Sequence, residues 1–193
     1  MSEHPRPPGV RPVGPPSPPK RRQRSLVLVN TGDGKGKSTA AFGIVMRGVA
    51  RRWRVVVIQF IKSDKWVVGE ERIAKELGVD WLKGGDGFTW ESPDLDRSEG
   101  RARAAWELAA ATIGAGEHQL VVLDELTYPM RWGWIPSAEV IAAITGRPEQ
   151  VNIVITGRDA PPELIEIADT VTEMRKVKHA YDRGIKARRG LDF

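Results

Sequence analysis

The fold of this chain is decided by residues 26–40, which read LVLVNTGDGKGKSTA. A short apolar run typical of a buried strand leads into three glycines that alternate with polar residues, and a helical pattern follows. A glycine-rich turn between a strand and a helix is typical of a phosphate-binding P-loop. Its backbone N–H groups turn toward an anion, and the helix N-terminus adds partial positive charge. The stretch therefore predicts a nucleotide-binding α/β fold.

The turn supplies most of the expected nucleotide contacts. The assigned residues are Gly32, Asp33, Gly34, Lys35, Gly36, Lys37, Ser38 and Thr39. Lys37 is expected to reach phosphate oxygens, and the Ser38 hydroxyl is placed to ligate a magnesium or manganese ion. Lys35 has two interpretations, a phosphate contact and a solvated loop charge. The motif departs from its usual form at Thr31, where glycine is usual.

Two carboxylates, Asp124 and Glu125, follow a second strand-like run at residues 120–123. Ligands of open parallel sheets bind beyond the carboxyl ends of the strands, so these acids are expected beside the P-loop. Magnesium takes oxygen ligands and keeps several waters, and we expect one of the two acids to hold it directly or through water. Which one does so is left open. Arg158 follows another predicted strand and is expected at the same edge, against a phosphate or the ribose.

The rest of the chain alternates strand-like and helical patterns. Strands are expected at 26–29, 55–60, 79–82, 120–123, 151–156 and 170–174, and helices at 37–52, 70–77, 97–113 and 137–144, with a further helix opened by Pro161 and Pro162. Such alternation favours right-handed βαβ units. The expected fold class is α/β, with an open, mainly parallel sheet flanked by helices, of the P-loop NTPase (RecA-like) type.

Composition and charge narrow the classes of function. The chain has 193 residues and no cysteine, which excludes disulfides and thiol nucleophiles. No apolar run is long enough to span a bilayer, and a cytoplasmic location is expected. The net charge of +5 lies in residues 1–24, a proline- and arginine-rich segment expected to be a disordered arm. Residues 25–193, the expected P-loop domain, carry 24 basic and 24 acidic side chains, a balance that speaks against a nucleic-acid partner.

The P-loop leaves the fate of the nucleotide open, because an ATPase or a kinase would use the same loop. Eight blocks of sequence resemble the P-loop-type corrinoid adenosyltransferases. They are 32–43 (GDGKGKSTAAFG), 59–62 (QFIK), 87–91 (GFTWE), 122–128 (VLDELTY), 156–158 (TGR), 162–165 (PELI), 172–175 (TEMR) and 178–185 (KHAYDRGI). The resemblance runs from about residue 26 to residue 193, and Thr31 agrees with the family pattern.

The resemblance implies transfer of the 5′-deoxyadenosyl group of ATP to the cobalt of a reduced corrinoid, with release of triphosphate, in adenosylcobalamin biosynthesis or salvage. It implies that Lys37 stabilises the departing triphosphate, and that Phe88 and Trp90 lie under the corrinoid and displace its lower axial ligand. It further implies a flavin or flavoprotein electron donor and a homodimer. His179 and Asp182 lie in the matching tail, where a structural role is the plainer interpretation.

Overall fold

The protein is described by a computed structural model that covers residues 25–61, 68–84 and 95–192. Its centre is a six-stranded, wholly parallel sheet in the order β3-β2-β4-β5-β1-β6. The strands are β1 (Val27–Thr31), β2 (Val55–Gln59), β3 (Asp80–Lys83), β4 (Leu120–Asp124), β5 (Asn152–Thr156) and β6 (Thr170–Glu173). β5 therefore lies between the strand that enters the P-loop and the strand that ends in the two acids.

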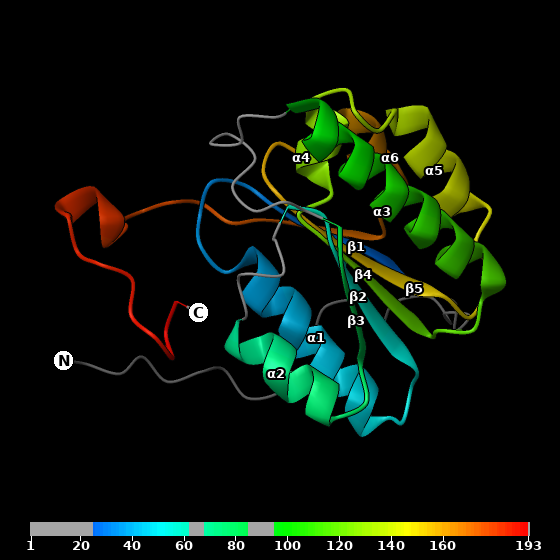
Figure 1. The fold of residues 1–193 in the computed structure, drawn as a ribbon, viewed down its shortest axis with the longest axis horizontal. Coiled ribbons are helices and arrows are strands. Elements are labelled where there is room, and N and C mark those ends of the chain that lie inside the picture. The colour runs from blue at the N-terminus through cyan, green and yellow to red at the C-terminus, as the bar shows by residue number, and fades with distance from the viewer. Residues whose placement is uncertain (1–24, 62–67, 85–94, 193) are drawn as a thin grey trace, which may run out of the picture.

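Helices cover both faces of this sheet (Figure 1). They are α1 (Lys37–Ala50), α2 (Gly69–Glu76), α3 (Leu95–Ala115), α4 (Thr127–Arg131), α5 (Ser137–Thr145) and α6 (Pro162–Ile167). A short 3₁₀ helix, η2 (Tyr181–Arg183), lies near the C-terminal end of the described residues. α1 and α2 lie on one face, and α3, α5 and α6 lie on the other (Figure 1). No helix within the described ranges is long and apolar enough to cross a membrane.

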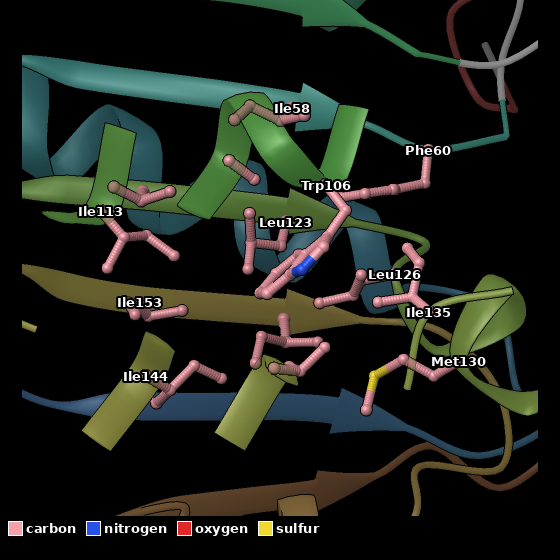
Figure 2. Packing of buried hydrophobic residues seen from close by; sticks show 14 of the residues in the cluster. Ile58, Phe60, Trp106, Ile113, Leu123, Leu126, Met130, Ile135, Ile144 and Ile153 are labelled. Atoms are coloured by element: carbon pink, nitrogen blue, oxygen red, sulfur yellow. The ribbon is translucent and has the colours of Figure 1, made fainter. Parts of the chain in front are cut away.

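Two apolar clusters hold the layers together, one on each face of the sheet. The larger cluster packs Trp106 and Ile113 of α3 against Ile58, Leu123 and Ile153, which come from three neighbouring strands (Figure 2). Fully burying one such side chain stabilises the fold by about 1.5–3 kcal/mol. The central strands β2 and β4 are buried along their whole length. A parallel sheet covered on both faces requires this unbroken apolar pattern.

The expected fold class is confirmed, and the order of strands and helices follows the sequence pattern. Element ends differ from expectation by a few residues; the first helix, for example, ends at Ala50 rather than at residue 52. The sequence pattern missed α4, a five-residue helix that contains Pro129. Proline disfavours a helix interior, and a helix this short shows no periodicity. Residues 1–24 lie outside the described residues, so the predicted arm stays a prediction.

Candidate functional site

The P-loop joins β1 to α1 and closes around the ammonium group of Lys37. Lys37 Nζ donates hydrogen bonds to the carbonyl oxygens of Gly32 at 2.7 Å and Gly34 at 2.6 Å. Gly32 and Gly36 have φ values of 91° and 114°, a left-handed conformation that glycine adopts at little cost. The expected strand–turn–helix context of the motif is confirmed, and the Lys37 charge lies inside the curve of the loop.

Gly34 makes a contact that the sequence did not indicate. Its N–H donates to the carbonyl oxygen of Met174, just beyond β6, at 2.5 Å. A Cβ atom added to Gly34 or to Gly32 would lie 2.6 Å from the same oxygen. The two glycines are therefore required by the close approach of a second backbone. The Gly34 N–H is directed at Met174 rather than into the loop.

Thr31 has a structural task that explains its place in the motif. Its hydroxyl accepts a hydrogen bond from the backbone N–H of Ala160 at 3.1 Å, and its carbonyl oxygen accepts one from the N–H of Met174 at 2.8 Å. The start of the P-loop is thus tied to the turn after β5 and to the chain after β6. Glycine at this position would lose the first of these bonds.

Asp124 and Glu125 are adjacent in sequence, but their environments differ. Asp124 is fully buried; its Oδ1 accepts a hydrogen bond from Thr156 Oγ1 at 2.7 Å, and its Oδ2 accepts one from Gln59 Nε2 at 2.8 Å. Glu125 is half-buried and lines the pocket at the P-loop. Its backbone has a φ of 65°, in the left-handed region that non-glycine residues seldom adopt. Both acids lie at the expected edge of the sheet, and Glu125 is the one that faces the pocket.

Arg158 is held at the same edge by the turn that follows β5. Thr127 at the start of α4 donates a hydrogen bond from its hydroxyl to the Arg158 carbonyl oxygen at 2.7 Å. Gly157 has a φ of 142°, and a Cβ atom there would overlap Thr127 Oγ1. The turn thus presses against α4, and Arg158 lines the pocket as expected.

These elements enclose a pocket of about 260 Å³. The expected residues that line it are Asp33, Gly34, Lys35, Gly36, Lys37, Ser38, Thr39, Glu125 and Arg158. Sequence reasoning did not assign Glu70, Tyr128 or Asp192 to the site, and it gave His179 a structural role, yet all four line this pocket. Tyr128 is the last residue of the 122–128 block that carries the family resemblance, and this block is the sequence signal that could have pointed to it.

The pocket is lined by charges of both signs, with Lys35, Lys37 and Arg158 beside Asp33, Glu70, Glu125 and Asp192. Burial, and then the positive charge of Arg158, lower the pKa of Lys37 below its ordinary 10.5. Burial, and then the negative charge of Glu125, raise the pKa of the Tyr128 hydroxyl. Tyr128 is therefore a neutral hydrogen-bonding group. Lys35 lines the pocket and forms an ion pair with Asp192. Neither the expected phosphate contact nor the expected solvated loop charge included this ion pair.

The oxygen donors in the pocket fit a magnesium-type cation. The Ser38 hydroxyl and the Glu125 carboxylate line the same space, and hard divalent cations take oxygen ligands. Within the described residues, no group of three or more His, Cys, Asp and Glu side chains could hold a metal ion unaided. A cation here would therefore share its coordination with phosphate oxygens and water, as magnesium does in nucleotide sites.

Phe88 and Trp90, the two residues assigned to the corrinoid, lie outside the described residues. They follow β3 in the sequence, and β3 pairs with β2 at the edge of the sheet. Their roles stay predictions that rest on the resemblance.

Comparison with known proteins agrees with the geometry of the pocket. Residues 23–193 match the family model described as ATP:corrinoid adenosyltransferase BtuR/CobO/CobP. A corrinoid adenosyltransferase of Pseudomonas aeruginosa is 44% identical over 175 residues, which is 90% of this chain and 86% of that protein. The corrinoid adenosyltransferase of Escherichia coli K12 is 40% identical over 89% of this chain and 87% of its own length. The corrinoid adenosyltransferase CobA of Salmonella typhimurium is 39% identical over 90% and 88%.

Proposed function

The chain belongs to the ATP:corrinoid adenosyltransferase family, and we propose that the pocket at its P-loop holds the triphosphate of ATP while the 5′ carbon is attacked by the cobalt of a reduced corrinoid. ATP-dependent adenosylation of a corrinoid, a step of cobalamin biosynthesis, follows from the family. The observation that carries the proposal is the convergence of Lys37, Glu125 and Arg158 on one pocket at the carboxyl ends of β1, β4 and β5.

The reaction needs a site that stabilises a departing triphosphate. A cobalt(I) nucleophile attacks the 5′ carbon, the carbon–oxygen bond to the α-phosphate breaks, and the triphosphate leaves with its additional negative charge. Lys37 and Arg158 are fixed cations in a half-buried pocket, where electrostatic stabilisation is stronger than in bulk water. Bound phosphate would take the place of the two P-loop carbonyl oxygens that now accept the Lys37 hydrogen bonds.

Ser38 and Glu125 are the side chains that would hold magnesium or manganese beside the phosphates, with Asp124 supporting them from the buried layer. When bound, such an ion neutralises phosphate charge and orients the leaving group. Other groups of the protein would also help to position the triphosphate. The N-terminus of α1 would add partial positive charge beside bound phosphates, and Tyr128, which lines the same pocket, would add a neutral hydrogen-bonding group.

The corrinoid side of the site is proposed from the resemblance. Phe88 and Trp90 would displace the lower axial ligand of the corrinoid, which makes the cobalt easier to reduce because axial ligation stabilises the oxidised metal. A reduced flavin or flavoprotein would supply the electron. A homodimer is proposed on the same basis, and the cytoplasmic location stays a prediction.

The products of the reaction test this proposal against an ATPase or a kinase. With ATP and chemically reduced corrinoid, phosphorus NMR should show inorganic triphosphate formed one for one with a carbon–cobalt bond. An ATPase breaks the β–γ linkage and yields ADP and phosphate. ADP as the main product, insensitive to corrinoid, would contradict the proposal.

The variant Lys37→Ala tests whether the pocket at the P-loop takes part in the reaction. It should cost about 3–4 kcal/mol of transition-state stabilisation, comparable to deleting a donor that stabilises a developing anion. Lys176→Ala is the matched control, because Lys176 pairs with Asp182 on the exposed tail. If Lys37→Ala is as active as Lys176→Ala, Lys37 does not contribute to the reaction.

A further inference from the structure

A chain of hydrogen bonds crosses the sheet under the pocket and ends at Glu125. Trp81 Nε1 on β3 donates to Gln59 Oε1 on β2 at 3.0 Å, and Gln59 Nε2 donates to Asp124 Oδ2 on β4 at 2.8 Å. Thr156 Oγ1 on β5 donates to Asp124 Oδ1 at 2.7 Å and accepts from the backbone N–H of Glu125 at 2.9 Å. Four neighbouring strands are thus joined at the same edge by side chains.

The direction of each bond is set by chemistry. The Gln59 amide nitrogen can only donate, and the Thr156 hydroxyl likewise donates to a carboxylate oxygen of Asp124. A threonine hydroxyl has one hydrogen, and this hydrogen is committed to Asp124. Its oxygen is then an acceptor with one fitting donor, the Glu125 N–H. Asp124 therefore fixes the orientation of the Thr156 hydroxyl, and that hydroxyl fixes the backbone of Glu125.

Glu125 needs such a restraint because its backbone is strained. A glutamate at a φ of 65° lies in the left-handed region, which a non-glycine residue keeps only when the surrounding structure holds it there. Asp124 continues β4 in extended form and is fully buried. The left-handed turn at the next residue lets the Glu125 side chain leave the sheet edge and line the pocket.

We propose that Thr156 is a positioning residue, whose hydroxyl transmits the fixed geometry of buried Asp124 to Glu125 and so aims the Glu125 carboxylate at the cation that accompanies ATP. This inference rests on the proposed role of Glu125 in the pocket. It assigns a different task to each acid, since Asp124 anchors the arrangement and Glu125 faces the ligand. Thr156 acts through Glu125 and need not touch the substrate.

The test measures ATP binding without corrinoid, so that no turnover occurs. Isothermal titration calorimetry at a series of magnesium concentrations gives the magnesium concentration that half-maximally strengthens ATP binding. Thr156→Val has nearly the same shape but can neither donate nor accept, whereas Thr156→Ser keeps both functions. Losing a positioning partner of a metal-facing residue costs about 10–100-fold in metal affinity. We expect Thr156→Val to raise the half-maximal magnesium concentration at least about tenfold, and Thr156→Ser to restore it.

Gln59→Met is the matched control. It removes the hydrogen bond of similar length to Asp124, together with the acceptor of the Trp81 indole N–H, but leaves the Thr156–Glu125 bond in place. Its magnesium requirement should stay close to that of the unaltered protein. An equal rise in Gln59→Met and Thr156→Val would show that the effect comes from Asp124 itself, and would overturn the inference. Thermal melting and magnesium-free ATP affinity confirm that each variant is folded.

Glu125→Gln separates the failure of this inference from failure of the proposed function. A rise in the magnesium requirement for Glu125→Gln without one for Thr156→Val overturns the positioning role alone. If Glu125→Gln leaves the requirement unchanged, the metal-facing role of Glu125 fails and the inference fails with it. A rise in both variants, restored by serine at position 156, supports the two together.

Discussion

Replacing Gly157 by alanine should loosen the turn that presents Arg158 to the pocket. The φ of Gly157 is 142°, where an L side chain is strained by about 1–3 kcal/mol. The new Cβ would also overlap Thr127 Oγ1 and lie 3.0 Å from Thr127 Cβ. Thr127 is fully buried, so its hydroxyl cannot move to water when its bond to the Arg158 carbonyl breaks. Leaving such a group unsatisfied costs about 1–3 kcal/mol.

The two costs together amount to about 2–6 kcal/mol, which corresponds to a fall of roughly 4–24 °C in melting temperature for a chain of this size. Urea unfolding followed by tryptophan fluorescence would measure the free energy of unfolding, and calorimetry would measure ATP affinity. Gly114→Ala is the control, because Gly114 lies in α3 with no atom within 4 Å of an added Cβ. It should stabilise the protein by roughly 0.5–1 kcal/mol.

A double-mutant cycle with Thr127→Ala isolates the steric part of the effect. Removing the Thr127 hydroxyl removes the closest overlap and leaves the 3.0 Å contact with the Cβ of residue 127, so Gly157→Ala should then cost the backbone strain and that remaining contact. The double variant should be more stable than the sum of the single variants predicts, by about 1–2 kcal/mol, as expected for residues in direct contact. Strict additivity, or a Gly157→Ala variant as stable as the unaltered protein, would refute this account of the turn.

Three further predictions concern other parts of the molecule. The kcat/KM for ATP should fall as the pH rises through the lowered pKa of Lys37, because the triphosphate needs the charged ammonium. In Arg158→Gln the alkaline limb of the pH profile should move to higher pH, since Arg158 is one cause of the lowered pKa; an unmoved limb would contradict this. Deleting residues 1–20 should leave thermal unfolding unchanged, because β1 begins at residue 27; a fall of many degrees would show that the arm belongs to the fold. Phe88→Ala or Trp90→Ala should slow reactions that start from cob(II) far more than those that start from cob(I). Equal losses of rate from both starting states in kinetic assays would show that the two residues have only a packing role.

Local patterns in the sequence were enough to place most of the site. The strand–turn–helix pattern around Lys37, the acids after a strand, and Arg158 after another strand each predicted a residue at the carboxyl edge of a parallel sheet. The structure brings Lys37, Glu125 and Arg158 to one pocket, while Asp124 is fully buried and does not line it. Each could be found because it follows directly from a strand end.

Other features depend on contacts that no local pattern encodes. The division of labour between Asp124 and Glu125 follows from one left-handed residue and from a hydroxyl 31 positions away. The partner of Gly34, Met174, is distant in sequence, and so is Asp192, which pairs with Lys35. Tertiary packing determines these contacts, which is why the residues of the tail were not assigned to the pocket.

The position of β1 in the sheet has a consequence for how the protein is made. β1 comes first in sequence among the six strands of the described sheet, yet its two neighbours are β5 and β6, the last two of the six. Until the ribosome has released residues 152–173, the strand that carries the P-loop has no partner. Contacts between such distant segments slow folding, because the loop between them must close first. We therefore expect ATP not to stabilise the nascent chain before β5 and β6 are made, and the apolar β1 to be prone to aggregation until then.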